Sequence, residues 1–372
     1  MNNLSVIGIG KLGLCFCLTL EKAGYDIIGC DINEQYVDKI NSKIFNSDEQ
    51  GVSEALAESV NFRATTSLKQ TIEHSDVIFT VVATPSLANG RYDHAQVDSV
   101  VSEIIKFGKQ RKEKHLIICC TTMPQYCDTV QQRLKDYNYT VSYNPEFIAQ
   151  GTILRDQAYP DMVLIGEGSK KAGDVLEEIY NAHTHSDPTI CRMSRTEAEI
   201  CKISLNCFLT TKIAFANMIG DIAKFSNCDQ DKILHAIGSD SRVGLKYLRY
   251  GFGYGGPCFP RDNRALAIFA NDLGVDALIS IASDESNKKH LEYQIEQFKS
   301  KTCNWQGTPD NPVVMETVSY KPESTMLVES QQLAYAVGLA ETGFSVVIRE
   351  RASVIEELKG RYGDLFEYQE VS

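Results

Sequence analysis

The chain has 372 residues, 43% hydrophobic and 23% charged, with 37 Lys and Arg against 49 Asp and Glu and a formal net charge of −12. Its length suggests two or three domains, and its apolar content excludes a disordered chain. The acidic balance excludes the broad positive field of a non-specific nucleic-acid binder, so we expect no nucleic-acid partner. No run of about 18 apolar residues is present, so we expect no membrane span. The N-terminus lacks the pattern of a secretory signal, so we expect a cytoplasmic protein.

The cysteines number 12, which in a small secreted protein would indicate disulfides. In a chain of this length without a signal, we expect them to be reduced and mostly buried. They show neither CxxC pairing nor Cys/His zinc spacing. His183 and His185 lack an evident third ligand and are assigned to a surface loop. We therefore expect no metal site.

The first third of the sequence alternates short apolar runs with amphipathic stretches. Strands are expected near residues 4–9, 26–31, 77–82 and 116–120, with helices near 12–23, 97–107 and 126–134. This alternation predicts a Rossmann-type parallel sheet that is covered on both faces.

The middle of the chain is predicted to be all-helical. Residues 195–225 contain no proline and repeat apolar residues at helical spacing, which indicates one long helix, with further helices near 230–237, 263–273 and 277–299. A linker near 308–312 precedes an expected strand at 313–319, a helix at 330–341 and a strand at 345–348. We therefore predict an α/β protein with domains at 1–194, 195–305 and 306–372, the last a small Rossmann-like domain.

A glycine-rich turn follows the first expected strand. Residues 8–13 read Gly-Ile-Gly-Lys-Leu-Gly and open a helix, the G-x-G-x-x-G context of a dinucleotide-binding turn. There the first glycine permits the bend, the second lets the backbone approach a pyrophosphate, and the third lets helix and strand pack closely. The expected cofactor contacts are those of Gly8, Gly10, Lys11, Leu12 and Gly13.

Asp31 ends the second expected strand, near the distance of about 20 residues at which an acid binds the adenosine ribose. An acid at this position would repel the 2′-phosphate of NADP, so we expect NAD. Two alternatives are a glycine turn without a ligand, and Asp31 as the N-cap of the following helix.

The segment 253–262 reads Gly-Tyr-Gly-Gly-Pro-Cys-Phe-Pro-Arg-Asp. Its glycines expose the backbone, its prolines fix the turn, and a helix is expected to begin just after it. A thiol at Cys258, beside Arg261 and Asp262, lies where a thiolate is favoured. The alternative is an inert cysteine in a glycine-rich loop.

This segment resembles the GGxCFPKD motif of the UDP-glucose/GDP-mannose dehydrogenases. Other segments resemble motifs of the same family in the same order, at residues 82–85, 121–124, 144–147, 199–206, 242–244 and 319–322. The resemblance implies an NAD-dependent oxidation of a sugar C6 alcohol to a carboxylate, with two NAD used in succession. UDP-glucose is the favoured substrate and UDP-glucuronate the expected product, for polysaccharide biosynthesis.

The resemblance also implies roles for individual residues. The expected catalytic residues are Cys258, Lys202, Asn206, Asp262, Glu146 and Thr122. Cys258 would form a thiohemiacetal and then a thioester. Lys202, Asn206 and Asp262 would stabilise the alkoxide and oxyanion and position a water, and Glu146 would act as the base for hydrolysis.

Further expected contacts follow from the same resemblance. Beyond the glycine turn and Asp31, the cofactor would touch Thr84, Pro85, Thr122, Glu146 and Arg261. The nucleotide-sugar site would be lined by Phe147, Ile148, Lys202, Asn206, Arg242, Tyr247, Leu248, Gly255 and Lys321. Arg242 would reach a partner subunit, in a homodimer built on the long helix.

The sequence departs from the family pattern at several positions. Gln150 stands where many members have a second glutamate, and Met162 replaces an arginine that is common in the UDP-glucose branch. Val328 aligns with an arginine that contacts the cofactor in the family, and the last domain looks shortened. These departures keep three alternatives open: a GDP-mannose or UDP-N-acetylhexosamine enzyme, a non-catalytic homologue that binds a nucleotide sugar or NAD, and a generic β-hydroxyacid dehydrogenase, although that last class needs no cysteine in such a loop.

Overall fold

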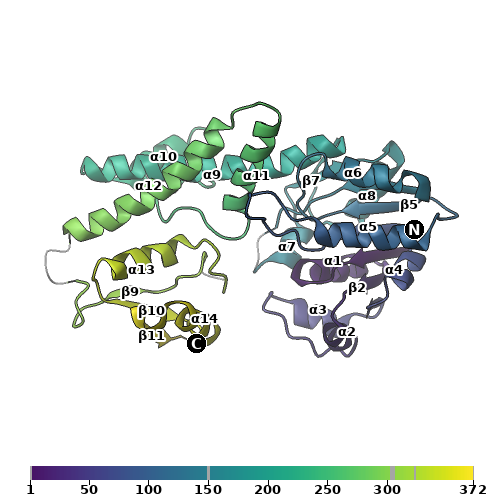
Figure 1. Cartoon of the computed structure of the whole chain (residues 1–372), viewed down its shortest axis with the longest axis horizontal. Coiled ribbons are helices and arrows are strands. Elements are labelled where there is room, and N and C mark those ends of the chain that lie inside the picture. The colour runs from purple at the N-terminus through teal and green to yellow at the C-terminus, as the bar shows by residue number, and fades with distance from the viewer. Residues whose placement is uncertain (1, 149–150, 302–305, 322–323, 372) are drawn as a thin grey trace. The chain divides into compact units, whose positions relative to one another are not determined.

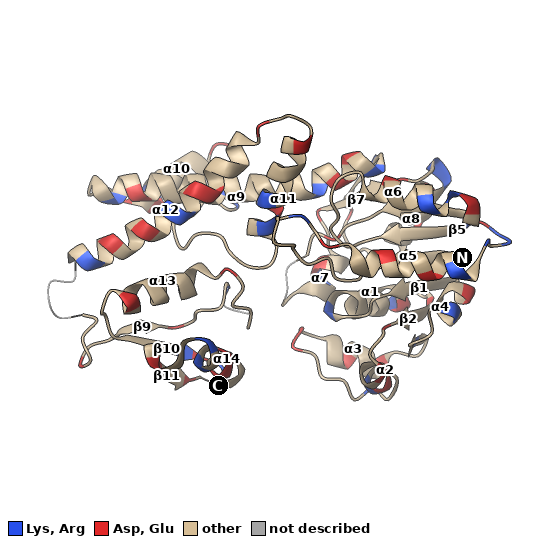
Figure 2. Cartoon of the chain, viewed as in Figure 1, with Lys and Arg blue, Asp and Glu red and all other residues tan. Residues whose placement is uncertain are grey.

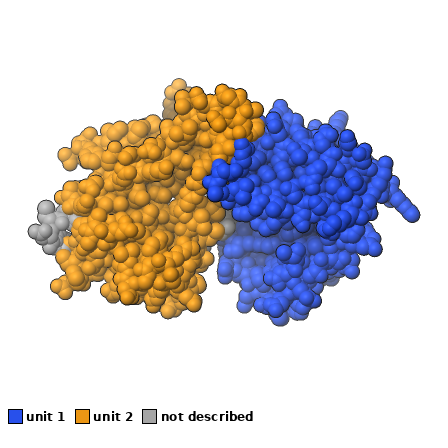
Figure 3. Space-filling view, viewed as in Figure 1, with its two compact units in different colours: residues 1–202 blue, residues 203–372 orange. Residues whose placement is uncertain are grey.

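The computed structural model describes residues 2–148, 151–301, 306–321 and 324–371 (Figure 1). The chain divides into two compact units, Met1–Lys202 and Ile203–Ser372 (Figure 3). Gln150, one of the departures from the family pattern, lies outside the described residues. The predicted division into three domains stays a prediction.

The first unit is built on an eight-stranded sheet in the order β3-β2-β1-β4-β5-β6-β7-β8. The strands are β1 Asn3–Ile7, β2 Asp26–Cys30, β3 Phe62–Thr65, β4 Val77–Thr80, β5 Lys114–Ile118, β6 Tyr139–Tyr143, β7 Met162–Gly166 and β8 Thr189–Met193. Only the β6–β7 pair is antiparallel among the pairings of these strands. The predicted α/β fold with a Rossmann-type sheet is confirmed.

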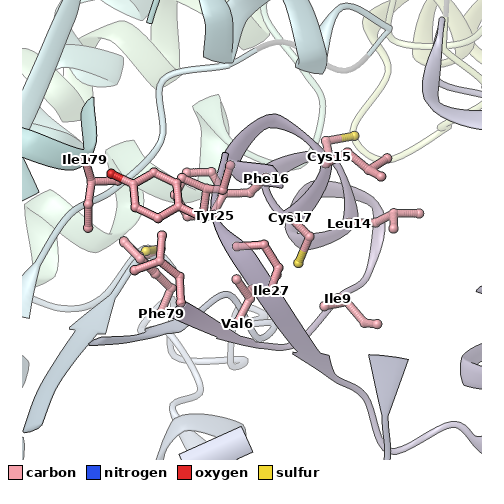
Figure 4. Packing of buried hydrophobic residues seen from close by; sticks show 14 of the residues in the cluster. Val6, Ile9, Leu14, Cys15, Phe16, Cys17, Tyr25, Ile27, Phe79 and Ile179 are labelled. Carbon is pink, nitrogen blue, oxygen red and sulfur yellow. The ribbon is translucent and has the colours of Figure 1, made fainter. Parts of the chain in front are cut away.

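Helices connect these strands. They are α1 Lys11–Lys22, α2 Glu34–Asn41, α3 Val52–Glu58, α4 Leu68–His74, α5 Ala95–Phe107, α6 Tyr126–Leu134, α7 Ile153–Ala158 and α8 Lys170–His183. Two apolar cores form, one around α1 and the other around α5 and α6. Figure 4 shows the first core, in which the rings of Phe16 of α1 and Phe79 of β4 pack edge to face with their centroids 5.0 Å apart. Full burial of such a side chain stabilises the fold by about 1.5–3 kcal/mol.

The strand order reverses beside β1, which pairs with β2 on one side and with β4 on the other. In open α/β sheets a ligand binds outside the carboxyl ends of the strands at such a point. The fold therefore places the glycine turn over residues 8–13 where a dinucleotide binds.

The long predicted helix is confirmed as α9, Arg195–Phe225, whose sequence runs on from the first unit into the second. The second unit continues with α10 Gln230–Gly238, α11 Phe259–Asp272 and α12 Leu278–Lys301. The charges on α12 and its neighbours are of both signs and interspersed (Figure 2). In the described parts of the chain, no helix is long and apolar enough to cross a membrane.

The second unit ends in a small parallel sheet in the order β11-β10-β9, formed by β9 Val313–Met315, β10 Val346–Glu350 and β11 Glu367–Glu370. Helices α13 Gln331–Glu341 and α14 Ala352–Tyr362 follow β9 and β10. The βαβ start expected near residues 313–348 is therefore present, and β11 extends it. Apolar side chains of α12, such as Phe298, pack on its core.

One local expectation is wrong. His183 is not part of a surface loop but is the buried last residue of α8, where its Nδ1 lies 2.9 Å from the carbonyl of Ile179. Burial lowers the pKa of this imidazole to about 4. Within the described ranges, no three His, Cys, Asp or Glu side chains gather as a metal site would require.

Candidate active site

The glycine turn has the geometry that a dinucleotide requires. Gly8 has a φ of +87°, which favours glycine, and a Cβ added at Gly13 would lie 2.0 Å from the carbonyl oxygen of Gly8. A Cβ at Gly10 would meet nothing within 4 Å, so its face is open. Gly10 is also the N-cap of α1 and makes no side-chain cap bond. The turn thus leaves room and helix N–H groups for a pyrophosphate, and it fits NAD.

Lys11 and Leu12 begin the first turn of α1, directly after this opening. Asp31 follows β2, and its Oδ1 accepts a hydrogen bond from the N–H of Asn33 at 3.0 Å. The N-cap of α2 is Asn33, whose side chain accepts from Tyr36 N–H at 3.1 Å. The alternative that Asp31 serves as this N-cap is therefore wrong.

Two threonines expected at the cofactor donate their hydroxyl protons into the protein. Thr84 donates to the carbonyl of Thr121 at 2.8 Å, and Thr122 donates to Oε1 of Glu199 at 2.9 Å. Both threonines are buried, whereas Pro85 is exposed beside Thr84. Glu199 belongs to a segment that resembles a family motif, yet no sequence pattern indicated this contact.

Glu146 follows β6, and the pKa of its carboxyl is shifted well away from the ordinary value. Burial raises the pKa of its carboxyl to about 7, while the Lys202 ammonium and the Tyr180 hydroxyl act to lower it. That hydroxyl lies 3.4 Å from Oε1 of Glu146 and donates to Oδ1 of Asn144 at 2.8 Å. A carboxyl with a pKa near 7 suits a general base at neutral pH. Sequence reasoning did not identify Tyr180.

Lys202 is buried near the start of α9, and its ammonium donates to the main-chain carbonyl of Glu146. The same ammonium lies 4.1 Å from the centre of the Phe147 ring. Ile148, the next residue, is half-buried and packs against the core around α1. The structure therefore brings together Glu146, Phe147 and Lys202, three residues expected at the site.

In the second unit, Asn206 and Asp262 form a direct pair. The side-chain amide of Asn206 donates to Oδ2 of Asp262 at 2.6 Å, and Asp262 is 1% exposed. Arg261 Nε lies 3.4 Å from the other carboxylate oxygen. Lys202 and Asn206 are four residues apart on α9, so they occupy successive turns on one helix face.

Cys258 is the exposed N-cap of α11, with Pro260 in the first turn of the helix. The N-terminal end of a helix favours negative charge, which supports a thiolate at this position. Among the described cysteines, Cys258 and Cys228 are exposed and the others are buried or half-buried. The described cysteines form no disulfide with one another.

The loop before Cys258 is held against the segment around Val328. A Cβ added at Gly255 would lie 2.2 Å from the carbonyl oxygen of Glu329, so only glycine fits there. The N–H of Gly256 donates to the carbonyl of Val328 at 3.0 Å. The Val328 side chain, where the family has arginine, is exposed. Arg264 of α11 forms a two-pronged ion pair with Glu329.

The other expected sugar contacts are dispersed over the second unit. Arg242 is exposed and pairs with Asp240 of its own loop at 2.8 Å. Tyr247 is exposed, with its ring 6.3 Å from that of Phe259, beside Cys258. Leu248 is buried in a core with residues of α9 and α10, so its side chain serves packing.

Two expected residues remain to be placed. Lys321 is half-buried, with its ammonium 5.9 Å from the centre of the Tyr320 ring. Met162 begins β7 and packs against the core around α5 and α6. The Met162 side chain therefore contributes to this core.

Family models and individual relatives both indicate the same protein family for this chain. Residues 2–184 match the NAD binding domain of the UDP-glucose/GDP-mannose dehydrogenase family, and residues 196–289 match its central domain. The chain is 30% identical to a GDP-mannose 6-dehydrogenase of Pseudomonas syringae pv. tomato, over 93% of this chain and 80% of that protein. It is 28% identical to a UDP-glucose 6-dehydrogenase of Pseudomonas aeruginosa, over 92% of this chain and 77% of that protein.

A solved UDP-glucose dehydrogenase of Pyrobaculum islandicum is also similar, with a TM-score of 0.89 and 27% identity, over 100% of this chain and 86% of that one. The glycine turn fits NAD, and the matched domain is the one that binds it in this family. The sequence matches and the shared fold together show that the chain belongs to the UDP-glucose/GDP-mannose dehydrogenase family of NAD-dependent nucleotide-sugar dehydrogenases.

Proposed function

We propose that the chain oxidises the C6 alcohol of a nucleotide sugar to the carboxylate, with UDP-glucose as the substrate and UDP-glucuronate as the product. The observation that carries this proposal is the exposed thiol of Cys258 at the N-terminus of α11, one helical turn before the buried Asp262, which accepts a hydrogen bond from Asn206. A simple alcohol dehydrogenase needs no nucleophile, whereas an oxidation that continues to the acid uses one to hold the aldehyde.

The reaction balances over two oxidation steps and one hydrolysis. Bound NAD would accept a hydride from the sugar C6 carbon in each oxidation, so two NADH form per sugar. In the first step the alcohol also loses a proton and becomes an aldehyde. The Cys258 thiolate then adds to the aldehyde carbon, and protonation of its oxygen gives a thiohemiacetal. Loss of the second hydride and of the hydroxyl proton gives a thioester, which water cleaves to the acid and the thiol.

The polar side chains have distinct tasks in this scheme. The Lys202 ammonium and the Asn206 amide donate hydrogen bonds to the oxygen that becomes negative, and such preorganised donors lower the barrier. Asp262 orients the Asn206 amide through the 2.6 Å bond. Glu146, with a pKa of about 7, takes a proton from the water that attacks the thioester.

A second substrate is favoured by two specific observations. The relative at 30% identity is a GDP-mannose 6-dehydrogenase, and Met162 replaces the arginine expected in the UDP-glucose branch. Against it, the chain fits the solved UDP-glucose dehydrogenase with a TM-score of 0.89 and a solved GDP-mannose dehydrogenase with one of 0.60. We therefore place UDP-glucose first and GDP-mannose second.

We further propose a homodimer built on α9 and a cytoplasmic location. Five large apolar side chains recur along α9 at helical spacing and are exposed: Phe208, Phe215, Met218, Ile222 and Phe225. Such a contiguous apolar face is typical of an interface between subunits. A reducing compartment agrees with the cysteines that the structure describes, which form no disulfide with one another.

A substrate panel tests the proposal. The purified protein is given NAD with UDP-glucose, GDP-mannose or UDP-N-acetylglucosamine, and NADH is followed by absorbance. We expect the highest kcat/KM with UDP-glucose. Higher kcat/KM with GDP-mannose would support the second candidate, and no turnover of any of the three would overturn the catalytic assignment.

A further inference from the structure

The hydroxyl of Tyr36 lies against the glycine turn. Tyr36 belongs to the first turn of α2, and its hydroxyl donates a hydrogen bond of 2.7 Å to the main-chain carbonyl of Ile9, the residue between Gly8 and Gly10. Burial raises the pKa of this hydroxyl, and the nearby Asp31 carboxylate adds to the rise. The hydroxyl therefore keeps its proton at neutral pH and acts as a donor to the turn.

Both partners of this hydrogen bond are fixed by their surroundings. The Ile9 side chain is fully buried in the core around α1 (Figure 4). The Tyr36 ring packs edge to face on that of Phe45, with the centroids 5.0 Å apart. The N–H of Tyr36 donates to the side chain of Asn33, the N-cap residue of α2, whose own N–H donates to Asp31. Tyr36 is thus held by its ring and by its main chain, and it holds the Ile9 carbonyl in one direction.

The direction of the Ile9 carbonyl decides where the N–H of Gly10 points. The peptide bond that joins the two residues is planar and trans, so its C=O and N–H point in opposite directions. Because the carbonyl is turned toward Tyr36, the N–H is turned away from it. Gly10 is exposed, and a Cβ there would meet nothing within 4 Å. In the described parts of the chain, no group accepts a hydrogen bond from this N–H, so it is open to a ligand.

We propose that Tyr36 is a positioning residue for the cofactor, whose hydroxyl holds the Ile9–Gly10 peptide so that the Gly10 N–H is directed to the pyrophosphate. Tyr36 itself touches no part of the cofactor in this scheme and acts through the peptide. A donor that is already oriented spares the ligand the cost of ordering the turn. The hydroxyl therefore strengthens the binding of ligands that contain the pyrophosphate and has little effect on adenosine, which lacks it.

Ligand binding by Tyr36→Phe tests this role. The substitution removes the hydroxyl alone and keeps the ring on Phe45 and the main-chain bond to Asn33. Tyr25→Phe is the matched control, because Tyr25 belongs to the core around α1 and precedes β2, whereas Asp31 follows that strand. The dissociation constant of NADH is measured by fluorescence titration, and those of ADP-ribose and adenosine by displacement of NADH, at a temperature where each variant is folded.

We expect Tyr36→Phe to raise the dissociation constants of NADH and of ADP-ribose about 5-fold each, as loss of one hydrogen bond does. The dissociation constant of adenosine should stay within about 2-fold of the wild-type value, and the control should bind all three ligands as the wild type does. Two results would overturn the proposal. One is a Tyr36→Phe protein that binds NADH and ADP-ribose like the wild type and differs only in melting temperature. The other is an equal weakening for adenosine, which would place the effect of the hydroxyl outside the pyrophosphate.

A second measurement on the wild type keeps the test decisive if Tyr36→Phe does not fold. The protein is labelled with ¹⁵N-glycine, and the Gly10 amide resonance is assigned by its absence from Gly10→Ala. ADP-ribose should move the Gly10 amide proton downfield, because a phosphate oxygen would accept a charge-assisted hydrogen bond from it, and adenosine should move it much less. A Gly10 resonance that ADP-ribose leaves unmoved would contradict the proposal. Both measurements follow binding, so a protein that binds NADH but oxidises no nucleotide sugar would refute the proposed function while they still decide the role of Tyr36.

Discussion

The side-chain amide of Asn206 donates a hydrogen bond of 2.6 Å to the carboxylate of Asp262, which is 1% exposed. The two residues are far apart in the sequence, on α9 and in the first turn of α11. A buried carboxylate next to an amide fixes which way the amide points. One N–H of the Asn206 amide is directed to Asp262, and under the proposed function the second would hold the developing oxyanion.

Asp262→Asn should therefore reduce kcat without unfolding the protein. The substitution keeps the shape of the side chain but removes the charge that orients Asn206. Loss of an oriented oxyanion donor costs about 100-fold to 1,000-fold in kcat. The check is steady-state kinetics beside thermal unfolding, with Asp272→Asn, at the exposed end of the same helix, as the control. Equal kcat in Asp262→Asn and the wild type would show that the pair is structural.

Glu146 predicts the pH dependence of acid formation. A base must be ionised, so activity should rise with pH through a midpoint near the pKa of about 7 that burial gives this carboxyl. Tyr180→Phe removes a hydrogen bond that lowers this pKa, so the midpoint should move to higher pH. The measurement is the pH profile of kcat for both proteins. An unmoved midpoint in Tyr180→Phe would show that the 3.4 Å contact does not stabilise the carboxylate.

Glu146 also predicts a cost in stability. Its folded pKa of about 7 lies above its ordinary value of 4.5, so the folded state holds a proton that the unfolded state releases. The favourable contribution is present below about pH 4.5 and is lost as pH rises through 7. Glu146→Gln mimics the neutral acid. As pH rises from 5 to 8, its free energy of unfolding should therefore increase relative to that of the wild type by up to about 3 kcal/mol. Denaturant unfolding of both proteins at pH 5 and pH 8 measures this change. A difference in the free energy of unfolding between variant and wild type that is the same at both pH values would contradict the raised pKa.

The same variant should stall the reaction at the thioester. Without the base for hydrolysis, Glu146→Gln should release two NADH per active site in a burst and then nearly stop. Stopped-flow absorbance measures the burst, and mass spectrometry should find the acyl group on the peptide that contains Cys258. Continued turnover at the wild-type rate would show that another group activates the water.

Gly10 and Gly13 separate a ligand-binding role from a folding role. A Cβ at Gly10 meets nothing within 4 Å, whereas one at Gly13 would lie 2.0 Å from the carbonyl of Gly8. Gly10→Ala should therefore keep the melting temperature within a few degrees but weaken NADH binding about 10-fold or more, because the methyl group would occupy the approach to the pyrophosphate. Gly13→Ala should melt at a lower temperature. The reverse order of melting temperatures would contradict this geometry.

The sequence predicted several of the strands and helices that bury continuous apolar runs. β1, β2, β4 and β5 and the helices α1, α5 and α6 were found for that reason, whereas α2, α3, α4, α7 and α8 were not predicted. β6 and β7 were missed although most of their residues are buried. β3 and β8 were missed and carry mainly exposed or half-buried residues, and β11 was missed because its four residues are largely polar and exposed. Strands of this kind owe their place to pairing with a neighbour, which local patterning does not record.

The sequence predicted individual site residues better than the contacts between them. Spacing and resemblance indicated Lys202 and Asn206 on one helix face, and α9 presents them on successive turns. Neither could show that Glu199 bonds to Thr122 or that Tyr180 lies beside Glu146, because those pairs are 77 and 34 residues apart. An isolated acid in a helix has the same sequence signature whether it is solvated or buried.

The stoichiometry of NADH in the wild type and in Cys258→Ala tests the central claim most directly. Each protein is given a limiting amount of UDP-glucose with excess NAD, and the NADH formed and the sugar product are measured together, with Cys228→Ala as the control at the other exposed described cysteine. The account predicts two NADH and one carboxylate per sugar for the wild type and the control, and no acid from Cys258→Ala, which should still bind NADH. Acid formation by Cys258→Ala at the wild-type rate would contradict it.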